Sequence, residues 1–291
     1  MPGFLYSYRK FRERYELPIV KNQDPEALTA LRRMTGPFVL RRLKKDVLRE
    51  LPGKEERIVY SAASGRQQKL YTASALKLKE ALAGGAWSGN GKLEVLSQLM
   101  RLRQICCDPA LCFEDYTGES AKLETCVSLI ASASAAGHKI LLFSQFASML
   151  ERIRERLLQE GISSHLLVGA TPKEERSRMV QAFASDEVPV FLISLKAGGT
   201  GLNLTAADIV IHYDPWWNVA AQNQATDRAY RIGQEKPVTV YKLILKDTIE
   251  ENLLKLQNAK LALAAQVVSE GMVSLGDLSQ NELMELFEQN P

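Results

Sequence analysis

The chain has 291 residues, of which 46% are hydrophobic and 24% are charged. This is the composition of an ordinary globular protein, and it argues against disordered, collagen-like and disulfide-framework classes. At roughly 100–200 residues per domain, the length predicts one large domain or two modest ones. The sequence has no uncharged apolar run long enough to span a membrane, and its N-terminus lacks the apolar core of a signal peptide, so we expect an intracellular protein.

The net charge of +3 is distributed unevenly along the chain. Residues 1–60 contain 14 Lys and Arg against 8 Asp and Glu, whereas residues 61–291 contain 23 against 26. A basic segment is typical of nucleic-acid binding, although a solvated helix face gives the same pattern. The four cysteines form no C-x-x-C pair and the chain has only three histidines, so we expect no metal site.

The first 135 residues are predicted to be mainly helical. Asp24 is placed to cap a helix whose first residue is Pro25. One short alternating stretch, 57–62, has the pattern of a strand. Further helices are expected over 37–54, 65–85, 92–107 and 121–136.

From His138 onward, short apolar or β-branched runs alternate with amphipathic helical segments. The expected strands are 139–144, 164–168, 188–194, 208–213 and 238–244. The expected helices are 146–160, 173–184 (with Thr171 as its N-cap), 219–231 and 247–268. Such alternation indicates parallel βαβ units, whose ligands bind at the carboxyl ends of the strands. The predicted fold is therefore an α/β parallel sheet flanked by helices, preceded by a mainly helical subdomain.

Residues 194–204, SLKAGGTGLNL, form a glycine-rich loop after the third of these strands. Three glycines in four residues let the backbone approach a ligand and expose its N–H groups to an anion. The loop has neither the G-x-G-x-x-G spacing of a dinucleotide site nor the G-x-x-x-x-G-K-[ST] pattern of a P-loop, and GNGKL at 89–93 is an incomplete match to the latter. No complete triphosphate-binding site is visible.

Residues 214–234, DPWWNVAAQNQATDRAYRIGQ, hold a second group of candidates. Arg228 and Arg231 are three residues apart, so on a helix they project to one face and can clamp a phosphoryl group. A surface ion-pair face with Asp227 is the alternative. The adjacent tryptophans fit either a stacking platform or core packing.

Two segments resemble motifs V and VI of the Swi/Snf family of DNA-translocating ATPases, within the superfamily-two helicases. They are LKAGGTGLNLTAADIVIHYDPWWN and the following QATDRAYRIGQ. Motif IV of that family is resembled by ILLFSQFASML. Two segments resemble parts of the helical region that lies between the two motor lobes of the family: GPFVLRRLKKDVLRELPGKEE and MRLRQICCDPALC. These motors hold ATP with Mg in the cleft between two RecA-like lobes, and double-stranded DNA crosses both. The P-loop and D-E-x-H box of the first lobe do not occur here.

The resemblance therefore implies a helical linker or protrusion region at 1–135, the second RecA-like lobe at 136–270 and a tail at 271–291. It implies arginine fingers at Arg228 and Arg231, with Arg231 on the γ-phosphate. The implied nucleotide-side residues are Gly201, Asn203, Gln224 and Asp227. The implied DNA-backbone contacts are Ser144, Gln145, Lys196, Gly198 and Thr200. Val219 and Gln222 stand where the family commonly has Pro and Glu, and Val168 where it has Asp.

We expect the second motor lobe of an ATP-dependent double-stranded DNA translocase of the chromatin-remodelling type, acting with an N-terminal RecA-like lobe on a DNA-bound protein. Without the P-loop lobe, the chain alone is expected not to hydrolyse ATP. A stand-alone DNA-binding or regulatory module is the alternative, and the glycine spacing disfavours a dinucleotide-dependent enzyme. The tail resembles that of bacterial members, which favours the bacterial cytoplasm or nucleoid over a nucleus.

Overall fold

The computed structural model describes residues 4–22, 24–38, 51–63, 65–84, 91–195, 197, 201–255 and 257. The chain divides into two compact units, one of Met1–Arg49 with Asn258–Gly271 and one of Glu50–Gln257 with Met272–Pro291. Residues 39–50, most of the predicted helix at 37–54, lie outside the described part, as do 258–268 of the last predicted helix and the tail 271–291. Among the described residues, no helix is both long and apolar enough to cross a bilayer.

The smaller unit is helical where it is described. Asp24 caps a helix as predicted, because its Oδ1 accepts the N–H groups of Glu26 at 2.9 Å and Ala27 at 3.2 Å. The helical segments are α1 (Tyr8–Phe11), the π-helical turn η1 (Arg12–Glu16), α2 (Leu17–Asn22), α3 (Pro25–Thr35) and the 3₁₀ turn η2 (Gly36–Phe38).

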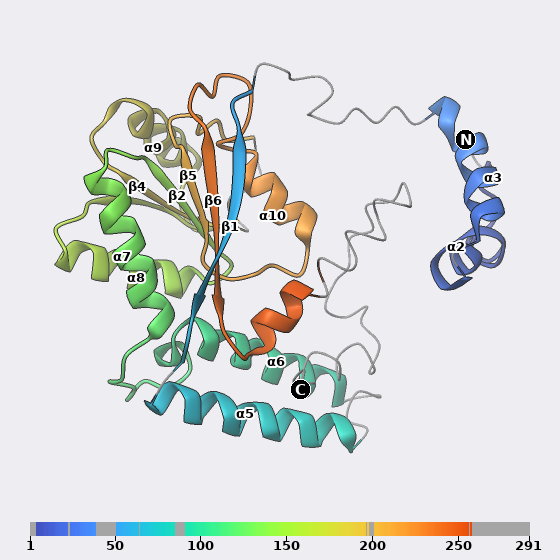
Figure 1. The fold of residues 1–291 in the computed structure, drawn as a ribbon, viewed down its shortest axis with the longest axis horizontal. Helices are drawn as coiled ribbons and strands as arrows, with labels where there is room; N and C mark the ends of the chain where they lie inside the picture. The colour runs from blue at the N-terminus through green and yellow to red at the C-terminus, as the bar shows by residue number, and fades with distance from the viewer. Residues whose placement is uncertain are drawn as a thin grey trace. The chain divides into compact units, whose positions relative to one another are not determined.

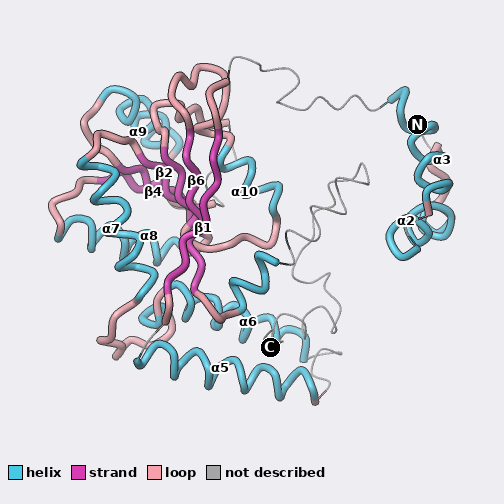
Figure 2. The backbone as a smooth tube through the Cα atoms, in the orientation of Figure 1, coloured by secondary structure: helices cyan, strands magenta, loops and turns pink. Residues whose placement is uncertain are grey.

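The larger unit is built on a six-stranded sheet in the order β1-β6-β5-β2-β4-β3, and every pairing in it is parallel (Figures 1 and 2). The strands are β1 (Lys54–Ser61), β2 (Ile140–Ser144), β3 (Ser164–Leu167), β4 (Val190–Ser194), β5 (Ile209–His212) and β6 (Val238–Leu245). The five strands predicted after His138 all form. This arrangement confirms the predicted α/β fold with a parallel sheet.

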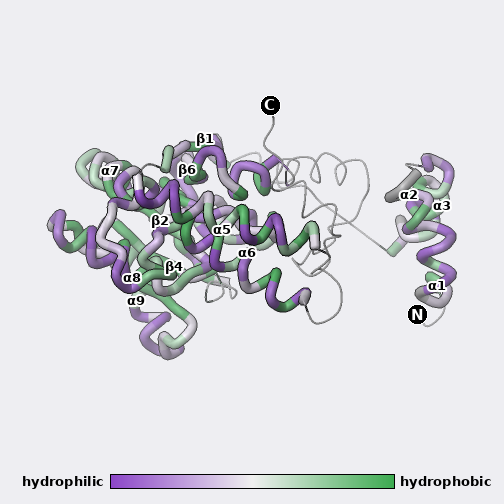
Figure 3. Tube along the Cα trace, turned by 90° about the horizontal axis from the view of Figure 1, so that it is seen from below, coloured by the Kyte–Doolittle hydropathy of each residue, from purple (hydrophilic) through white to green (hydrophobic). Residues whose placement is uncertain are grey.

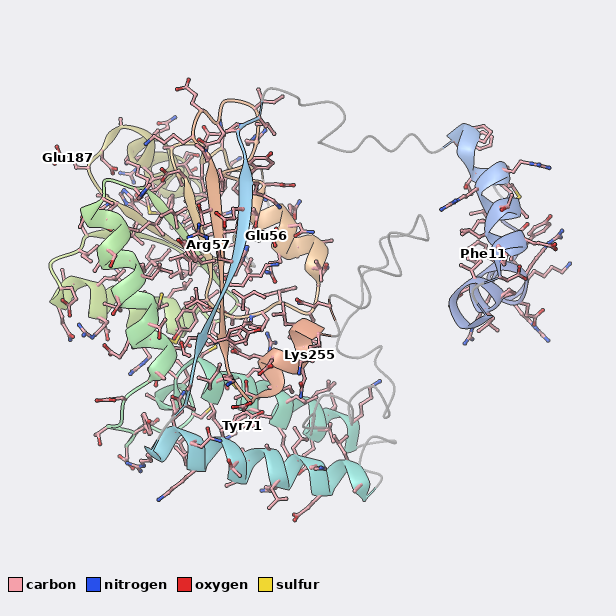
Figure 4. All side chains as sticks on the ribbon, in the orientation of Figure 1. Phe11, Glu56, Arg57, Tyr71, Glu187 and Lys255 are labelled. Atoms are coloured by element: carbon pink, nitrogen blue, oxygen red, sulfur yellow. The ribbon has the colours of Figure 1, made fainter. Side chains whose placement is uncertain are left out.

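The edge strand β1 comes from the part of the chain predicted to be mainly helical. It pairs with β6 from Lys54↔Val238 to Ser61↔Leu245, so the sheet includes residues from both sides of the expected boundary at 135/136. Most of β1 is exposed, and it carries charged residues such as Glu56 and Arg57 on alternate faces (Figure 4). Charged side chains on an edge strand discourage pairing with another chain.

Helices cover both faces of the sheet. On one face, α7 (Ala121–Ala135) and α8 (Ala147–Gln159) pack on residues such as Ile140 and Leu142. On the other face, α9 (Lys173–Ser185) and α10 (Val219–Thr226) pack on residues such as Leu141 and Phe143. Because both faces are buried, the central strands β2, β4 and β5 are apolar except for their last residues, and hydrophobic residues gather along them (Figure 3).

A helical pair lies at the carboxyl end of β6 (Figure 1). It consists of α5 (Gly65–Ala83) and α6 (Gly91–Cys107), which share a core cluster with Leu245 and Ile249. Tyr71 of α5 points toward the short helix at 249–255, and its hydroxyl accepts the N–H of Ile249 at 2.7 Å (Figure 4). A 3₁₀ turn, η3 (Pro109–Leu111), follows α6.

The predicted N-cap at Thr171 is wrong. Pro172 occupies the cap position of α9, with a ψ of 152°. The Thr171 Oγ1 atom instead accepts the N–H of Val168 at 3.1 Å, so it closes the turn after β3.

Candidate functional site

The segment after α10, residues 227–233, is a series of turns that we call the arginine turn. The sequence predicts a helix to residue 231, but α10 ends at Thr226. The Arg228 carbonyl accepts the N–H of Leu204 at 3.1 Å, and Gly233 has a φ of +98°. Tyr230 still donates its N–H to the Thr226 carbonyl at 3.1 Å, but the regular helix has ended, so the expectation that Arg228 and Arg231 share one helix face is wrong.

Gln234 holds the arginine turn in place, and the sequence interpretation missed this role. Its side-chain Nε2 lies 2.8 Å from the carbonyl oxygen of Ala207 and 3.1 Å from those of Thr205 and Ala229. Gln234 is buried. The amide therefore fastens the turn to the segment that leads into β5.

The two arginines of the turn have different surroundings. Arg228 is only 5% exposed, and its Nε has no hydrogen-bond partner among the described residues. Burial, and then the positive charge of Arg231, lower the pKa of Arg228, while Asp227 opposes the shift. Arg231 is exposed. A buried guanidinium with an unsatisfied N–H is costly, and an anion relieves that cost.

Gly201 and Asn203 lie beside this turn. Both are exposed, and both line a surface groove of about 620 Å³ together with Lys173 and Arg176. Arg176 donates from Nη1 to the Ala197 carbonyl at 2.8 Å, and its Nε has no partner in the described part of the chain. Gly201 has a φ of +43°, a conformation that favours glycine. The groove is therefore basic, and at Gly201 its backbone has no side chain to keep an anion away.

Two further predicted site residues belong to α10 or its end. Gln224 is exposed on α10 and Asp227 is half-buried at its end. The predicted DNA contacts Lys196, Gly198 and Thr200 lie outside the described residues.

Ser144 and Gln145, predicted to contact DNA, surround a buried carboxylate. The fully buried Ser144 donates from Oγ to Asp214 Oδ1 at 2.5 Å. Gln145 donates from Nε2 to Asp214 Oδ2 at 2.6 Å and from its backbone N–H to Oδ1 at 3.2 Å. Their polar groups are thus engaged within the protein, where the carboxyl ends of β2 and β5 meet.

Arg103 of α6 completes this cluster, although no sequence signal singled it out. Its Nη1 donates to Gln145 Oε1 at 2.8 Å, and its Nη2 donates to the Pro215 carbonyl at 2.7 Å. The Nη2 also lies 3.8 Å from Asp214 Oδ2, and Arg103 is 2% exposed.

Comparisons with known proteins identify the family of the chain. Residues 1–111 match the family model for the SNF2-related domain, and residues 121–233 match the helicase conserved C-terminal domain. The solved C-terminal domain of the Sulfolobus solfataricus SWI2/SNF2 ATPase is 31% identical with a TM-score of 0.66, over 82% of this chain and 100% of that structure. The chain belongs to the SWI2/SNF2 family.

Further SWI2/SNF2 relatives extend beyond this chain. The S. solfataricus ATPase core in complex with double-stranded DNA is 34% identical with a TM-score of 0.69, over 100% of this chain and 62% of that one. The putative ATP-dependent helicase/translocase YwqA of Bacillus subtilis is 41% identical over 98% of this chain and 32% of its own length. An uncharacterized ATP-dependent helicase of Mycoplasma genitalium, MG018, is 38% identical over 99% of this chain and 27% of its own length. The chain spans about a third or less of these two curated relatives.

The loop after β5, residues 213–218, is the Trp loop of this SWI2/SNF2 chain. Trp217 is half-buried against the α5–α6 cluster, with the Arg103 guanidinium 5.5 Å from its ring centroid, so core packing is the role that the structure supports. Trp216 donates its N–H to Gln222 Oε1 at 3.3 Å and accepts a hydrogen bond from Gln257 on its carbonyl. Gln222, where the family commonly has Glu, keeps an acceptor oxygen there without a charge.

A buried ion pair lies beneath the same loop. Lys122 Nζ is 2.5–2.6 Å from both carboxylate oxygens of Glu250 and donates to the Tyr213 carbonyl at 3.2 Å. Burial disfavours charge on Lys122, but attraction to Glu250 outweighs it and raises the pKa of Lys122. The pair joins α7, the end of β5 and the helix at 249–255, and helical periodicity alone did not reveal it.

Proposed function

We propose that this SWI2/SNF2 chain is the second RecA-like lobe of a DNA-dependent ATPase and supplies Arg228 and Arg231 to ATP held mainly by a P-loop lobe. The observation that carries the proposal is the buried Arg228 Nε, which has no hydrogen-bond partner among the residues that the structure describes, next to the exposed Arg231. A lone buried N–H donor of this kind fits a phosphate oxygen. The ATP-dependent relatives support the assignment, and the magnesium ligands belong to the P-loop lobe in this proposal.

The two arginines have complementary roles in this proposal. Phosphoryl transfer develops negative charge that a guanidinium stabilises, and such arginines contribute about 10³–10⁵ in rate in other NTPases. Arg231 is exposed and free to reach the transferring phosphate. Arg228 is held by the Leu204–Arg228 backbone bond and offers its Nε to a phosphate oxygen from a fixed position.

We also propose that the basic groove lined by Lys173 and Arg176 follows the backbone of double-stranded DNA, so that Gly201 and Asn203, which the resemblance places on the nucleotide side, face DNA in this proposal. Lys173 and Arg176 supply charge, and Gly201, which has no side chain, leaves its backbone open to a phosphate. Contacts to phosphates position a protein without reading sequence, which suits a translocase. The archaeal relative solved with double-stranded DNA supports this assignment.

The decisive experiment measures DNA-stimulated ATP hydrolysis by the chain alone and by the chain joined to a P-loop lobe of the family. We expect no hydrolysis by the chain alone. In the two-lobe protein, Arg231→Ala is expected to lower kcat by about 10³ or more. Arg154→Ala, at an exposed position on α8, is the control and should leave kcat unchanged.

Two outcomes would contradict the proposal. One is hydrolysis by the chain alone that Arg231→Ala abolishes. The other is a two-lobe protein that shows no DNA-stimulated hydrolysis, while the chain alone binds DNA in a salt-dependent way. In that case substitutions of Arg228 and Arg231 would leave the DNA binding unaffected. The second outcome would favour a stand-alone DNA-binding or regulatory module.

A further inference from the structure

Arg103 connects the helical pair α5–α6 to two loops at the carboxyl ends of the sheet. Its guanidinium donates to Gln145, which follows β2, and to the Pro215 carbonyl, which follows β5. The rings of Phe146 and Trp217 have centroids 5.9 Å and 5.5 Å from its Cζ. One side chain of α6 therefore contacts both loops.

The cluster leaves Arg103 little freedom to move. Asp214 is 1% exposed and has Ser144, Gln145 and Arg103 around its carboxylate. Gln145 uses both ends of its amide, one on Arg103 and one on Asp214. A fully connected buried network has one favourable arrangement, because each displaced group loses its partner in a region of low dielectric.

The helix α10 joins the Trp loop to the arginine turn. Asn218 caps α10 by accepting the N–H of Ala221 on Oδ1 at 3.1 Å, and Gln222 of the same helix accepts the N–H of Trp216. The helix α10 has only eight residues, and Arg228 follows two residues after its end. The position of the Trp loop therefore determines where this short helix, and the turn after it, begin.

We propose that Arg103 is a positioning residue that ties the α5–α6 pair to the Trp loop and, through α10, to the arginine turn. This inference rests on the proposed function for its effect on hydrolysis, but not for the tie itself. Ser144 and Gln145 act as links in the tie, because their polar side-chain atoms are used on Asp214 and Arg103. Movement of the helical pair is thereby coupled to Arg228 and Arg231, which bind ATP in the proposed function.

Hydrogen exchange in the chain tests the tie directly. In Arg103→Gln we expect the amides of 214, 216–218 and 227–233 to exchange at least about tenfold faster, while those of β2 and β4 stay protected. Arg101→Gln is the matched control, since Arg101 is exposed on the same helix and faces Phe113 at 4.9 Å. Faster exchange confined to α6, or equal effects of both variants, would overturn the proposal.

A double variant covers the case in which Arg103→Gln does not fold. Arg103→Gln with Asp214→Asn removes both buried charges, so folding should recover. The shorter Gln side chain cannot span Gln145 and Pro215 together, so exchange in the Trp loop should stay fast. Recovery of slow exchange in the Trp loop would show that the single variant acts only by leaving a buried charge unpaired. That result would overturn the proposal that Arg103 ties the helical pair to the loop.

Steady-state kinetics of the two-lobe protein test the coupling. We expect Arg103→Gln to lower DNA-stimulated kcat at least about tenfold with the KM for ATP within about twofold, because the ATP-binding lobe is unaltered. Arg101→Gln should change neither. An unchanged kcat, or a rise in KM alone, would contradict the coupling. If the unaltered two-lobe protein does not hydrolyse ATP, the proposed function fails, and the exchange experiment still decides the tie.

Discussion

Arg103 and Arg228 are both buried arginines of the larger unit, but their guanidinium groups have different surroundings. Arg103 has hydrogen bonds to Gln145 and Pro215 and a carboxylate, Asp214, within 3.8 Å. Arg228 has a buried Nε without a partner among the described residues, and the nearby charge of Arg231 repels it. Buried polar groups are normally satisfied. The satisfied arginine therefore has a structural role, and the unsatisfied one is suited to an anion that arrives from outside.

The largest expected effect separates these two arginines by stability. Arg103→Met leaves Asp214 buried without its cation and should lower the free energy of unfolding by about 3–5 kcal/mol. Arg228→Met removes an unsatisfied donor and should change it by less than about 1 kcal/mol. Urea unfolding of both variants gives the comparison. Equal losses would show that the two sites do not differ as described.

The Lys122–Glu250 pair extends the comparison to a second satisfied cation. Both residues are fully buried, so Lys122→Met leaves the Glu250 carboxylate buried without a cation. This substitution should lower the free energy of unfolding by about 3–5 kcal/mol. The double variant with Glu250→Leu should recover most of that loss, because it leaves no unpaired charge. Urea unfolding measures both. A double variant as unstable as the single one would mean that packing, rather than charge pairing, dominates here.

Gln234 tests what holds the arginine turn. Gln234→Leu removes the donor shared by three carbonyl groups and should destabilise the protein by about 1–3 kcal/mol. Gln224→Leu is the control at an exposed position of α10 and should stay within about 0.5 kcal/mol. Hydrogen exchange should show the turn opening in the first variant only. Unchanged exchange at 227–233 in Gln234→Leu would show that Gln234 does not hold the arginine turn.

His212 of β5 is another buried group with one unsatisfied atom, and it gives a pH dependence. Burial, and then the charge of Lys242, lower the pKa of His212 to about 3. Its Nδ1 has no partner among the described residues, while Nε2 lies 2.9 Å from Thr226 Oγ1. As the pH falls below about 6.5, His212 becomes protonated in the unfolded chain but not in the folded one. The free energy of unfolding should therefore fall by at most about 1.4 kcal/mol per pH unit.

The measurement is urea unfolding between pH 7 and pH 5, with His212→Gln as the comparison. The variant should lose most of this slope, because the glutamine has no proton to gain. An identical slope in both proteins would assign the pH dependence to other groups.

Strand prediction succeeded where the signal is local. The runs at β2, β4 and β5 are apolar because both faces of the sheet are covered, and a short window detects that. The stretch that forms β1 was also recognised as a strand, but its partner β6 begins at Val238, far along the chain. No short-range pattern predicts that pairing.

The candidate site was predictable only in part. Motif resemblance located Arg228 and Arg231, but periodicity extended α10 too far, because the Leu204 and Gln234 contacts that form the turn come from outside the helix. Arg103 and Lys122 look like the polar face of a helix, and only the packed structure brings their carboxylate partners to them. Ser144 and Gln145 were predicted to contact DNA, and no sequence feature indicated that Asp214 engages them.

The most direct test of the account is the turnover of the two-lobe protein carrying Arg228→Met, measured at saturating ATP and DNA beside its unfolding free energy. We expect kcat to fall by about 10² or more, while the free energy of unfolding stays within about 1 kcal/mol of that of the unaltered protein. Unchanged turnover in a stably folded variant would contradict the claim that the unsatisfied arginine serves ATP.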